Sequence, residues 1–156
     1  MRGMIVLVLV MSLAGASGLA ARSEEAIFPE FLAGTLGGYV GAFLGANTLS
    51  WALSSGATGW DALSRAILGA YVGFAAGAVV GSALGVIGTA ALLGVEGNVG
   101  LCLLGAAAGT GGILIFGFSL QIPEAVLPVG PAIAAVCATA GFNVRARSRQ
   151  PATEGP

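Results

Sequence analysis

Four long apolar stretches dominate the chain, and short polar or turn-forming breaks separate them. The stretches cover residues 29–53, 61–93, 99–120 and 124–144. A helix rises 1.5 Å per residue, so about 20 apolar residues cross the roughly 30 Å hydrocarbon core of a bilayer. The pattern therefore predicts an all-α fold, an integral membrane bundle of about four apolar helices.

Polar residues at the breaks indicate where the first two helices begin. Pro29 suits the first turn of a helix, and Glu30 favours the positive end of the helix dipole. Asp61 is expected to cap the second helix and to form an ion pair with Arg65, four residues further on. The first helix is therefore expected from about Pro29 and the second from Asp61.

The fourth apolar stretch is interrupted by Pro128 and Pro131. Only the roughly thirteen residues from Pro131 to Asn143 continue without a further interruption, which is shorter than the ~20 residues that a spanning helix needs. Residues 124–144 therefore form either a kinked span or a re-entrant or interfacial helix.

Glycines recur every four residues within three of the stretches. This spacing returns to nearly the same side of a helix, so each series forms a stripe of bare backbone. In water an interior glycine costs about 1 kcal/mol relative to alanine, whereas in a bilayer the groove lets another helix approach closely. The spacing predicts glycine-zipper packing, with the partner helix in the same chain or in a neighbouring copy. The helix-packing residues are Gly37, Gly41, Gly45, Gly69, Gly73, Gly77, Gly81, Gly85, Gly105 and Gly109; Gly34 and Gly38 form an adjoining row.

The first twenty residues are typical of a cleavable export signal. Arg2 supplies the positive start, residues 5–13 the short apolar core, and Gly18 and Ala20 the small residues before a cut. An uncleaved N-terminal anchor is the alternative. The expected organisation is a signal peptide (1–20), a short polar segment (21–28), one transmembrane helical domain (29–144) and a polar, disordered tail (145–156). Export places the mature chain in the cell envelope, in the inner or plasma membrane by preference, with the outer membrane as the alternative.

Composition agrees with a membrane location and excludes several functions. Charged residues make up 8% of the chain, against roughly 25% in soluble domains. The net charge of −1 gives no basis for binding nucleic acid. The expected partners are the lipid bilayer and either itself or other membrane helices.

Candidate catalytic groups are largely missing from the sequence. The chain has no histidine, and its six basic residues are all arginines. This removes histidine general bases, lysine Schiff bases and the phosphate-binding lysine of a P-loop. We expect no enzymatic activity, no catalytic residues, no metal, no cofactor and no identifiable small-molecule substrate.

The few polar residues inside or beside the apolar stretches leave alternatives open. Asn47 either bonds across helices or lines a polar path. Glu96 and Glu124 either face water or act as buried transport carboxylates. Cys102 and Cys137 either pack as small residues or form a disulfide after export.

Aromatic and basic residues indicate where the chain meets the membrane surface. Trp51 and Trp60 flank the first loop, as interfacial anchors do. Arg145, Arg147 and Arg149 form either a solvated tail or a contact with anionic lipid.

The chain resembles the small Sec-exported glycine-zipper membrane proteins. The resemblance rests on residues 34–41 (GTLGGYVG), on the stripe from Gly69 to Gly85, and on the ending Ala140-Gly141-Phe142-Asn143-Val144-Arg145. It implies a multi-helix protein of the cell envelope, and most such proteins have no assigned activity.

Two functions are compatible with this pattern. The first is a structural or assembly role through close helix–helix packing. The alternative is a small channel or transporter accessory subunit, in which Asn47, Glu96 or Glu124 tunes a path. A pore needs a polar row along at least one helix, and glycine and alanine dominate here, so the structural role is favoured.

Overall fold

A computed structural model describes residues 24–121, 123–144 and 147–148 of the chain. These residues form four helices and two short strands: α2 (Glu24–Ser54), α3 (Gly59–Leu92), β1 (Val95–Glu96), α4 (Val99–Leu120), α5 (Pro123–Asn143) and β2 (Arg147–Ser148). The predicted all-α fold is confirmed. The predicted signal peptide (1–20) lies outside the described residues.

Three of the described helices are long and apolar enough to cross a membrane. They are α2 over Ala26–Ser54, α3 over its whole length, and α4 over its whole length. The apolar part of α5, Leu127–Asn143, is shorter. By length and composition these are the helices of a membrane protein.

The starts of α2 and α3 differ from the predicted ones. Helix α2 begins at Glu24 and continues through Pro29, which the sequence analysis placed at its start. Thr58, not Asp61, is the N-cap of α3, so the predicted cap is wrong. Asp61 instead lies in the first turn, where its charge still favours the helix dipole. The predicted ion pair is confirmed, with Arg65 Nη2 lying 3.0 Å from Asp61 Oδ2.

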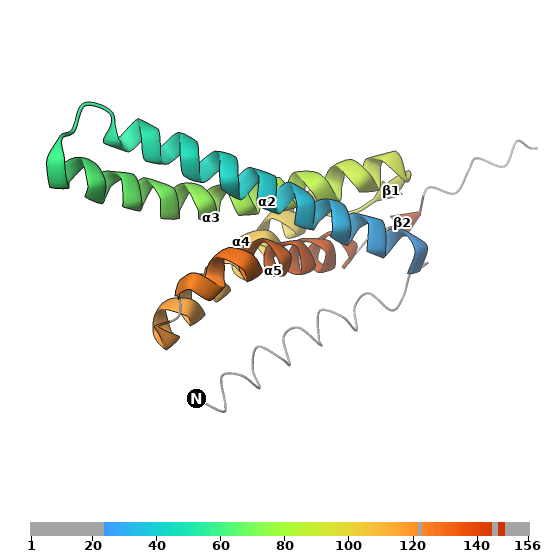
Figure 1. Ribbon diagram of the computed structural model, residues 1–156. Helices are drawn as coiled ribbons and strands as arrows, with labels where there is room; N and C mark the ends of the chain where they lie inside the picture. Colours follow the sequence, from blue (N-terminus) through green and yellow to red (C-terminus); the bar gives the residue numbers. More distant parts are fainter. Residues whose placement is uncertain (1–23, 122, 145–146, 149–156) are drawn as a thin grey trace, which may run out of the picture.

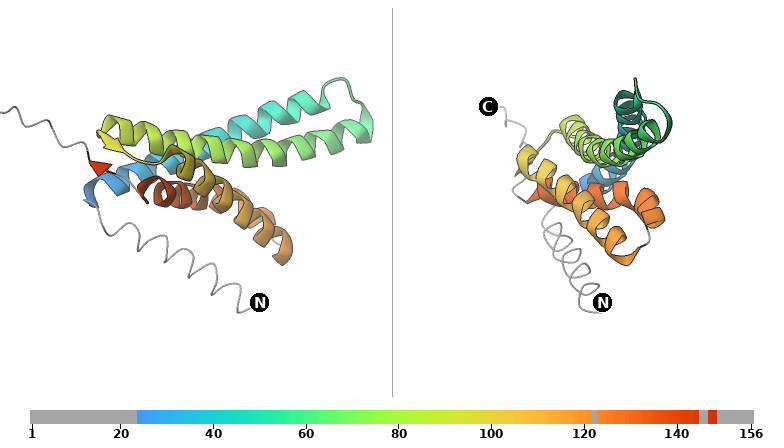
Figure 2. Two further views of the ribbon diagram at one scale, coloured as in Figure 1. Left: turned by 180° about the vertical axis from the view of Figure 1, so that it is seen from behind. Right: turned by 90° about the vertical axis from the view of Figure 1, so that its left-hand side faces the viewer.

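The helices form two antiparallel hairpins, α2–α3 and α4–α5. Gly56, at φ +85°, takes the left-handed conformation that the tight α2–α3 turn requires. Figure 1 and the left view of Figure 2 show the hairpins close together at the end that carries β1 and β2 and spread apart at their tips. Helix α5 packs against both α2 and α3.

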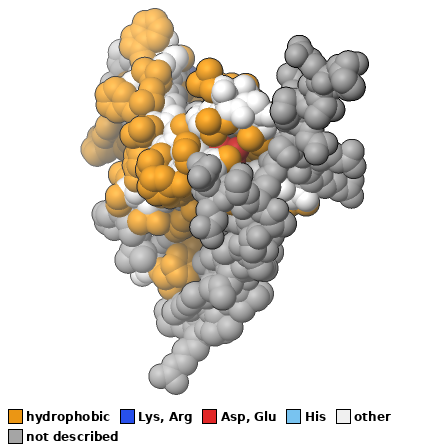
Figure 3. All heavy atoms as spheres, turned by 90° about the vertical axis from the view of Figure 1, so that its right-hand side faces the viewer, with side chains coloured by type: hydrophobic (Ala, Val, Ile, Leu, Met, Phe, Trp, Pro, Cys, Tyr) orange, Lys and Arg blue, Asp and Glu red, His pale blue; other side chains and the backbone are white. Residues whose placement is uncertain are grey.

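The closed end holds a core of mainly small side chains, with Phe142 as its one aromatic ring, from α3, α4 and α5. Its buried members are Ala83, Val86, Ala90, Cys102, Ala106, Ala138 and Phe142. Strands β1 and β2 pair antiparallel beside this core, with Glu96 opposite Arg147. Many larger apolar side chains are exposed on the outside. Figure 3, viewed from this end, shows hydrophobic side chains over much of the described surface. Small residues inside and large ones outside suit a helical protein surrounded by lipid.

Candidate functional site

The longest interhelical contact joins the glycine stripes of α2 and α3. A Cβ built on Gly37, Gly41 or Gly45 would overlap the carbonyl oxygen of Gly81, Gly77 or Gly73, respectively. The overlap is reciprocal, because a Cβ on each of these α3 glycines would meet the carbonyl of its α2 partner. Because the two helices are antiparallel, each step of four residues toward the end of α2 meets a glycine four residues nearer the start of α3. The stripe of α3 therefore faces a stripe of the same chain.

The contact continues at both ends of this row. A Cβ on Gly69 would lie 2.6 Å from the carbonyl oxygen of Leu49, and a Cβ on Gly85 would overlap the carbonyl of Ala33. In each glycine a hydrogen points at the carbonyl in place of the Cβ. This arrangement suits weak Cα–H···O hydrogen bonds between the two backbones.

The adjoining row on α2 faces α5 and α3. A Cβ on Gly34 would lie 2.8 Å from Cγ2 of Val86 and 3.3 Å from Cβ of Ala135. A Cβ on Gly38 would lie 3.2 Å from Cβ of Pro131. Helix α2 therefore uses two neighbouring faces, one against the backbone of α3 and one against side chains of both α3 and α5.

The α4–α5 hairpin repeats the same packing on a smaller scale. A Cβ on Gly105 would overlap the carbonyl of Cys137, and one on Gly109 would lie 3.0 Å from the carbonyl oxygen of Ile133. Gly141, which is not among the predicted packing residues, closes the row from the α5 side against the carbonyl of Leu101.

Polar side chains of the first hairpin contact the proline-containing part of α5. The Tyr39 hydroxyl donates to the carbonyl of Pro128, and the Ser82 hydroxyl donates to the carbonyl of Pro131 at 3.5 Å. Helix α5 continues through both prolines, which lack the N–H donors of an unbroken helix. Protein packing on this side keeps the irregular stretch away from lipid, which is where such backbone is tolerated.

A buried polar cluster joins the start of α2 to the end of α5. Glu30 is 0% exposed, and its Oε2 accepts a hydrogen bond of 2.7 Å from Nδ2 of Asn143. The same amide donates to the backbone carbonyl of Thr139 at 2.9 Å. Thr139 is also buried, and its hydroxyl has no hydrogen-bond partner among the described residues. This is a side-chain hydrogen bond between the two hairpins.

The burial of Glu30 corrects the sequence analysis, which assigned it to the helix dipole. Because α2 begins at Glu24, Glu30 lies beyond the first turn and faces α5. The spacing carried a signal for this position: Glu30, Gly34, Gly38 and Ala42 follow each other at intervals of four. All four are buried on one face of α2.

The other predicted polar residues lie away from this cluster. Asn47 is exposed, and its amide donates to the carbonyl of Phe43 in its own helix at 2.7 Å. Its proposed part in an interhelical bond or a polar path stays a prediction. Glu96 is exposed in β1, as expected for a residue facing water. Glu124 lies in the first turn of α5, and its side chain is outside the described part.

Cys102 and Cys137 are separate thiols and form no disulfide with each other. Cys102 is buried in the core, and Sγ of Cys137 lies beside Gly109. Both therefore occupy the packing positions that the first alternative described. Among the described residues, no three His, Cys, Asp or Glu side chains gather to hold a metal ion.

Comparison with protein-family profiles, curated proteins and solved structures finds no match to the chain. Its function is therefore inferred from the geometry of its own helices.

Proposed function

We propose that the chain is a non-enzymatic structural protein of the cell envelope, whose close-packed helices form a rigid unit within a membrane. Reciprocal backbone contact along α2 and α3 carries the proposal. Contacts of this kind fix the separation and register of two helices, because neither backbone can move closer or slide without overlap.

The lining of the bundle also favours a structural role over a path for ions. The residues between the helices are mainly glycine, alanine and valine, and those in the core have almost no exposed surface. A conducting path needs polar groups or water along its length. The buried polar side chains of the described part are few, namely Glu30, Ser82, Thr110 and Thr139.

An assembly role would use the outward faces of the helices. The glycine rows of α2 and α3 are occupied within the chain, so another membrane protein would contact the larger side chains outside. Leu36, Phe43, Leu84 and Leu104 are exposed examples. We propose the inner or plasma membrane as the location, supported by the apolar helices and the export-like N-terminal sequence.

Single-channel recording tests this proposal. The purified full chain is reconstituted in planar bilayers, beside the Asn47→Leu variant and empty bilayers. We expect no reproducible conductance from either protein. A conductance that depends on the chain and changes in Asn47→Leu would overturn the structural role in favour of the channel alternative. Crosslinking in the native membrane, followed by identification of the linked proteins, would identify neighbours of the outward faces.

A further inference from the structure

Residues from the parts of the four helices nearest β1 and β2 lie close together. Glu30 of α2 is hydrogen-bonded to Asn143 of α5. The backbone N–H of Asn98, the N-cap of α4, donates to the carbonyl of Phe142 at 3.0 Å. Gly85 of α3 lies against Ala33 of α2, which brings the last turns of α3 beside Glu30. We call this set of polar and end residues (Glu30, Asn98 and Asn143) the closed-end level.

Three of the helices extend from the closed-end level by about the thickness of a hydrocarbon core, whereas α3, with 34 residues and about 51 Å, is longer and tilts or extends past it. Along α2, Glu30 to Trp51 is about 32 Å, and along α4, Asn98 to Gln121 is about 34 Å. Along α5, Asn143 back to Glu124 is about 29 Å. These lengths match the roughly 30 Å of a bilayer interior.

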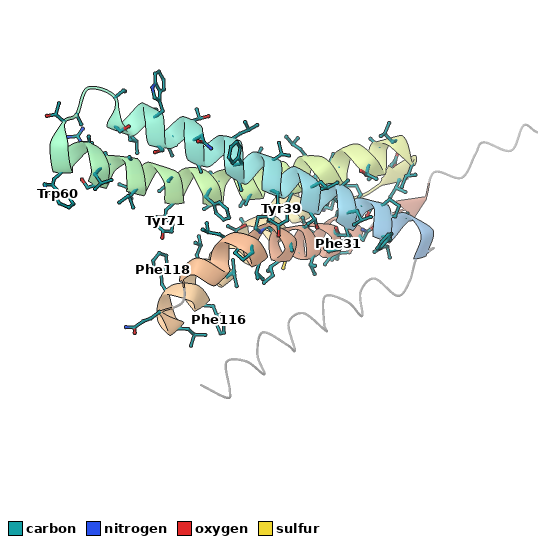
Figure 4. The ribbon with its side chains drawn as sticks, viewed as in Figure 1. Phe31, Tyr39, Trp60, Tyr71, Phe116 and Phe118 are labelled. Atoms are coloured by element: carbon teal, nitrogen blue, oxygen red, sulfur yellow. The ribbon has the colours of Figure 1, made fainter. Side chains whose placement is uncertain are left out.

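Polar and interfacial residues mark the far ends of the helices. Trp51 and Trp60 are 74% and 85% exposed at the tip of the first hairpin, where the exposed Asp61–Arg65 ion pair also lies. Figure 4 shows Trp60 at this tip. Gln121 is exposed at the tip of the second hairpin. Tryptophan and hydrated ion pairs are favoured where the bilayer meets water.

The short apolar length of α5 is compensated by its position. Its inner face is covered by α2, α3 and α4, with Pro131, Ala134, Ala135 and Ala138 buried. A helix shielded by protein needs less hydropathy than one surrounded by lipid, and its prolines are tolerated for the same reason.

From these observations we infer that all four helices, α5 included, cross the bilayer. The α2–α3 and α4–α5 turns then face one side of the membrane. The α3–α4 connection and the two ends of the described segment 24–144 face the other. The pairing of β1 with β2 holds two parts of this second side together. The inference rests on the membrane location in the proposed function and adds the course of the chain through the bilayer.

Cysteine labelling in intact cells tests this arrangement on the full chain. The four variants are Ser55→Cys and Ser119→Cys near the two tips, and Leu93→Cys and Val144→Cys near the closed end; all four positions are exposed. Each is treated with a membrane-impermeant maleimide before and after the membrane is permeabilised. The unmodified chain measures the background from Cys102 and Cys137.

We expect one pair of variants, either the two at the tips or the two at the closed end, to be labelled before permeabilisation. The other pair should be labelled only after it. If Val144→Cys is labelled under the same condition as the tip variants, α5 returns to the side on which it begins. That result would overturn the inference. All four reacting alike would overturn it as well, because no helix would then separate the two ends.

Val80→Cys is the matched control. Val80 is 51% exposed in the structure, close to the 61% of Val144, yet it lies near the middle of the proposed apolar span. We expect its labelling to stay at background under both conditions. Labelling equal to that of Val144→Cys would show water at this depth and would contradict the inference. A failure of the labelling pattern leaves the conductance test intact, so the two proposals fail separately.

Discussion

Gly41 and Gly77 face each other across α2 and α3, and neither position has room for a Cβ, because it would overlap the carbonyl oxygen of the other residue. We expect Gly77→Ala to destabilise the bundle by about 1–3 kcal/mol, the usual effect of overpacking, and Gly77→Leu to destabilise it further. Unfolding of the purified chain in detergent, followed by circular dichroism, measures this.

Gly88 provides the matched control on the same helix, because a Cβ there would meet nothing within 4 Å. We expect Gly88→Ala to leave stability unchanged or to raise it by up to about 1 kcal/mol, through the lower flexibility of alanine. The exposed Leu84→Ala should also have little effect. Equal losses in Gly77→Ala and Gly88→Ala would contradict the close contact.

The second hairpin allows the same comparison within α4. Gly105 contacts the backbone of Cys137, whereas Gly111 and Gly112 face open space. We expect Gly105→Ala to lower the unfolding temperature and Gly111→Ala or Gly112→Ala to leave it unchanged. A thermal scan in detergent gives both values. If the Gly112 variant unfolds as early as the Gly105 variant, the outward face of α4 is also packed, and a partner must cover it.

The buried hydrogen bond between Glu30 and Asn143 is expected to show energetic coupling. Loss of one partner of a buried polar group costs about 1–3 kcal/mol, so Asn143→Ala and Glu30→Ala should each destabilise the bundle. The double variant should be less destabilised than the sum of the two, by about 0.5–3 kcal/mol. A double-mutant cycle on unfolding free energies measures this coupling. Pairing Glu30→Ala with Asn47→Ala gives the control cycle, because Asn47 lies far along α2 and its effect should simply add.

The Tyr39 hydroxyl links the first hairpin to α5 through the Pro128 carbonyl. We expect Tyr39→Phe to reduce stability by about 0.5–1.5 kcal/mol, the net value of one hydrogen bond. Tyr71→Phe is the control, since its described contact is between rings: the ring centroids of Tyr71 and Phe118 lie 6.1 Å apart. Figure 4 shows these two side chains on α3 and α4. An unfolding temperature lowered equally in both variants would rule out a specific role for the Tyr39 hydroxyl.

Most of the helix boundaries could be predicted from the sequence because long apolar runs and turn residues are local signals. The predicted third helix agrees with α4 at both ends, and α5 is shifted by one residue. Proline is common in a first turn and so predicts a start of α2 at Pro29, whereas the helix begins at Glu24 and continues through Pro29. Thr58 was overlooked as a cap because Asp61 offered the stronger charge signal.

The contact partners of each row could not be predicted, since spacing shows which residues share a face but not what that face meets. The Gly37 stripe and the Gly34 row are neighbours on α2, yet the first meets the backbone of α3 and the second meets both α3 and α5. Glu30 was misassigned for the same reason. A carboxylate near a helix start usually faces water, and this one is buried where α2 packs against the other helices and bonds to Asn143 of α5.

The short turn at residues 55–58 makes the partnership of α2 and α3 intramolecular. Two separate helices joined by such a row would dissociate when diluted in lipid, because their encounter depends on their surface density. A tethered pair keeps the same effective concentration at any expression level. The bundle should therefore hold its shape in a sparsely populated membrane as well as in a crowded one.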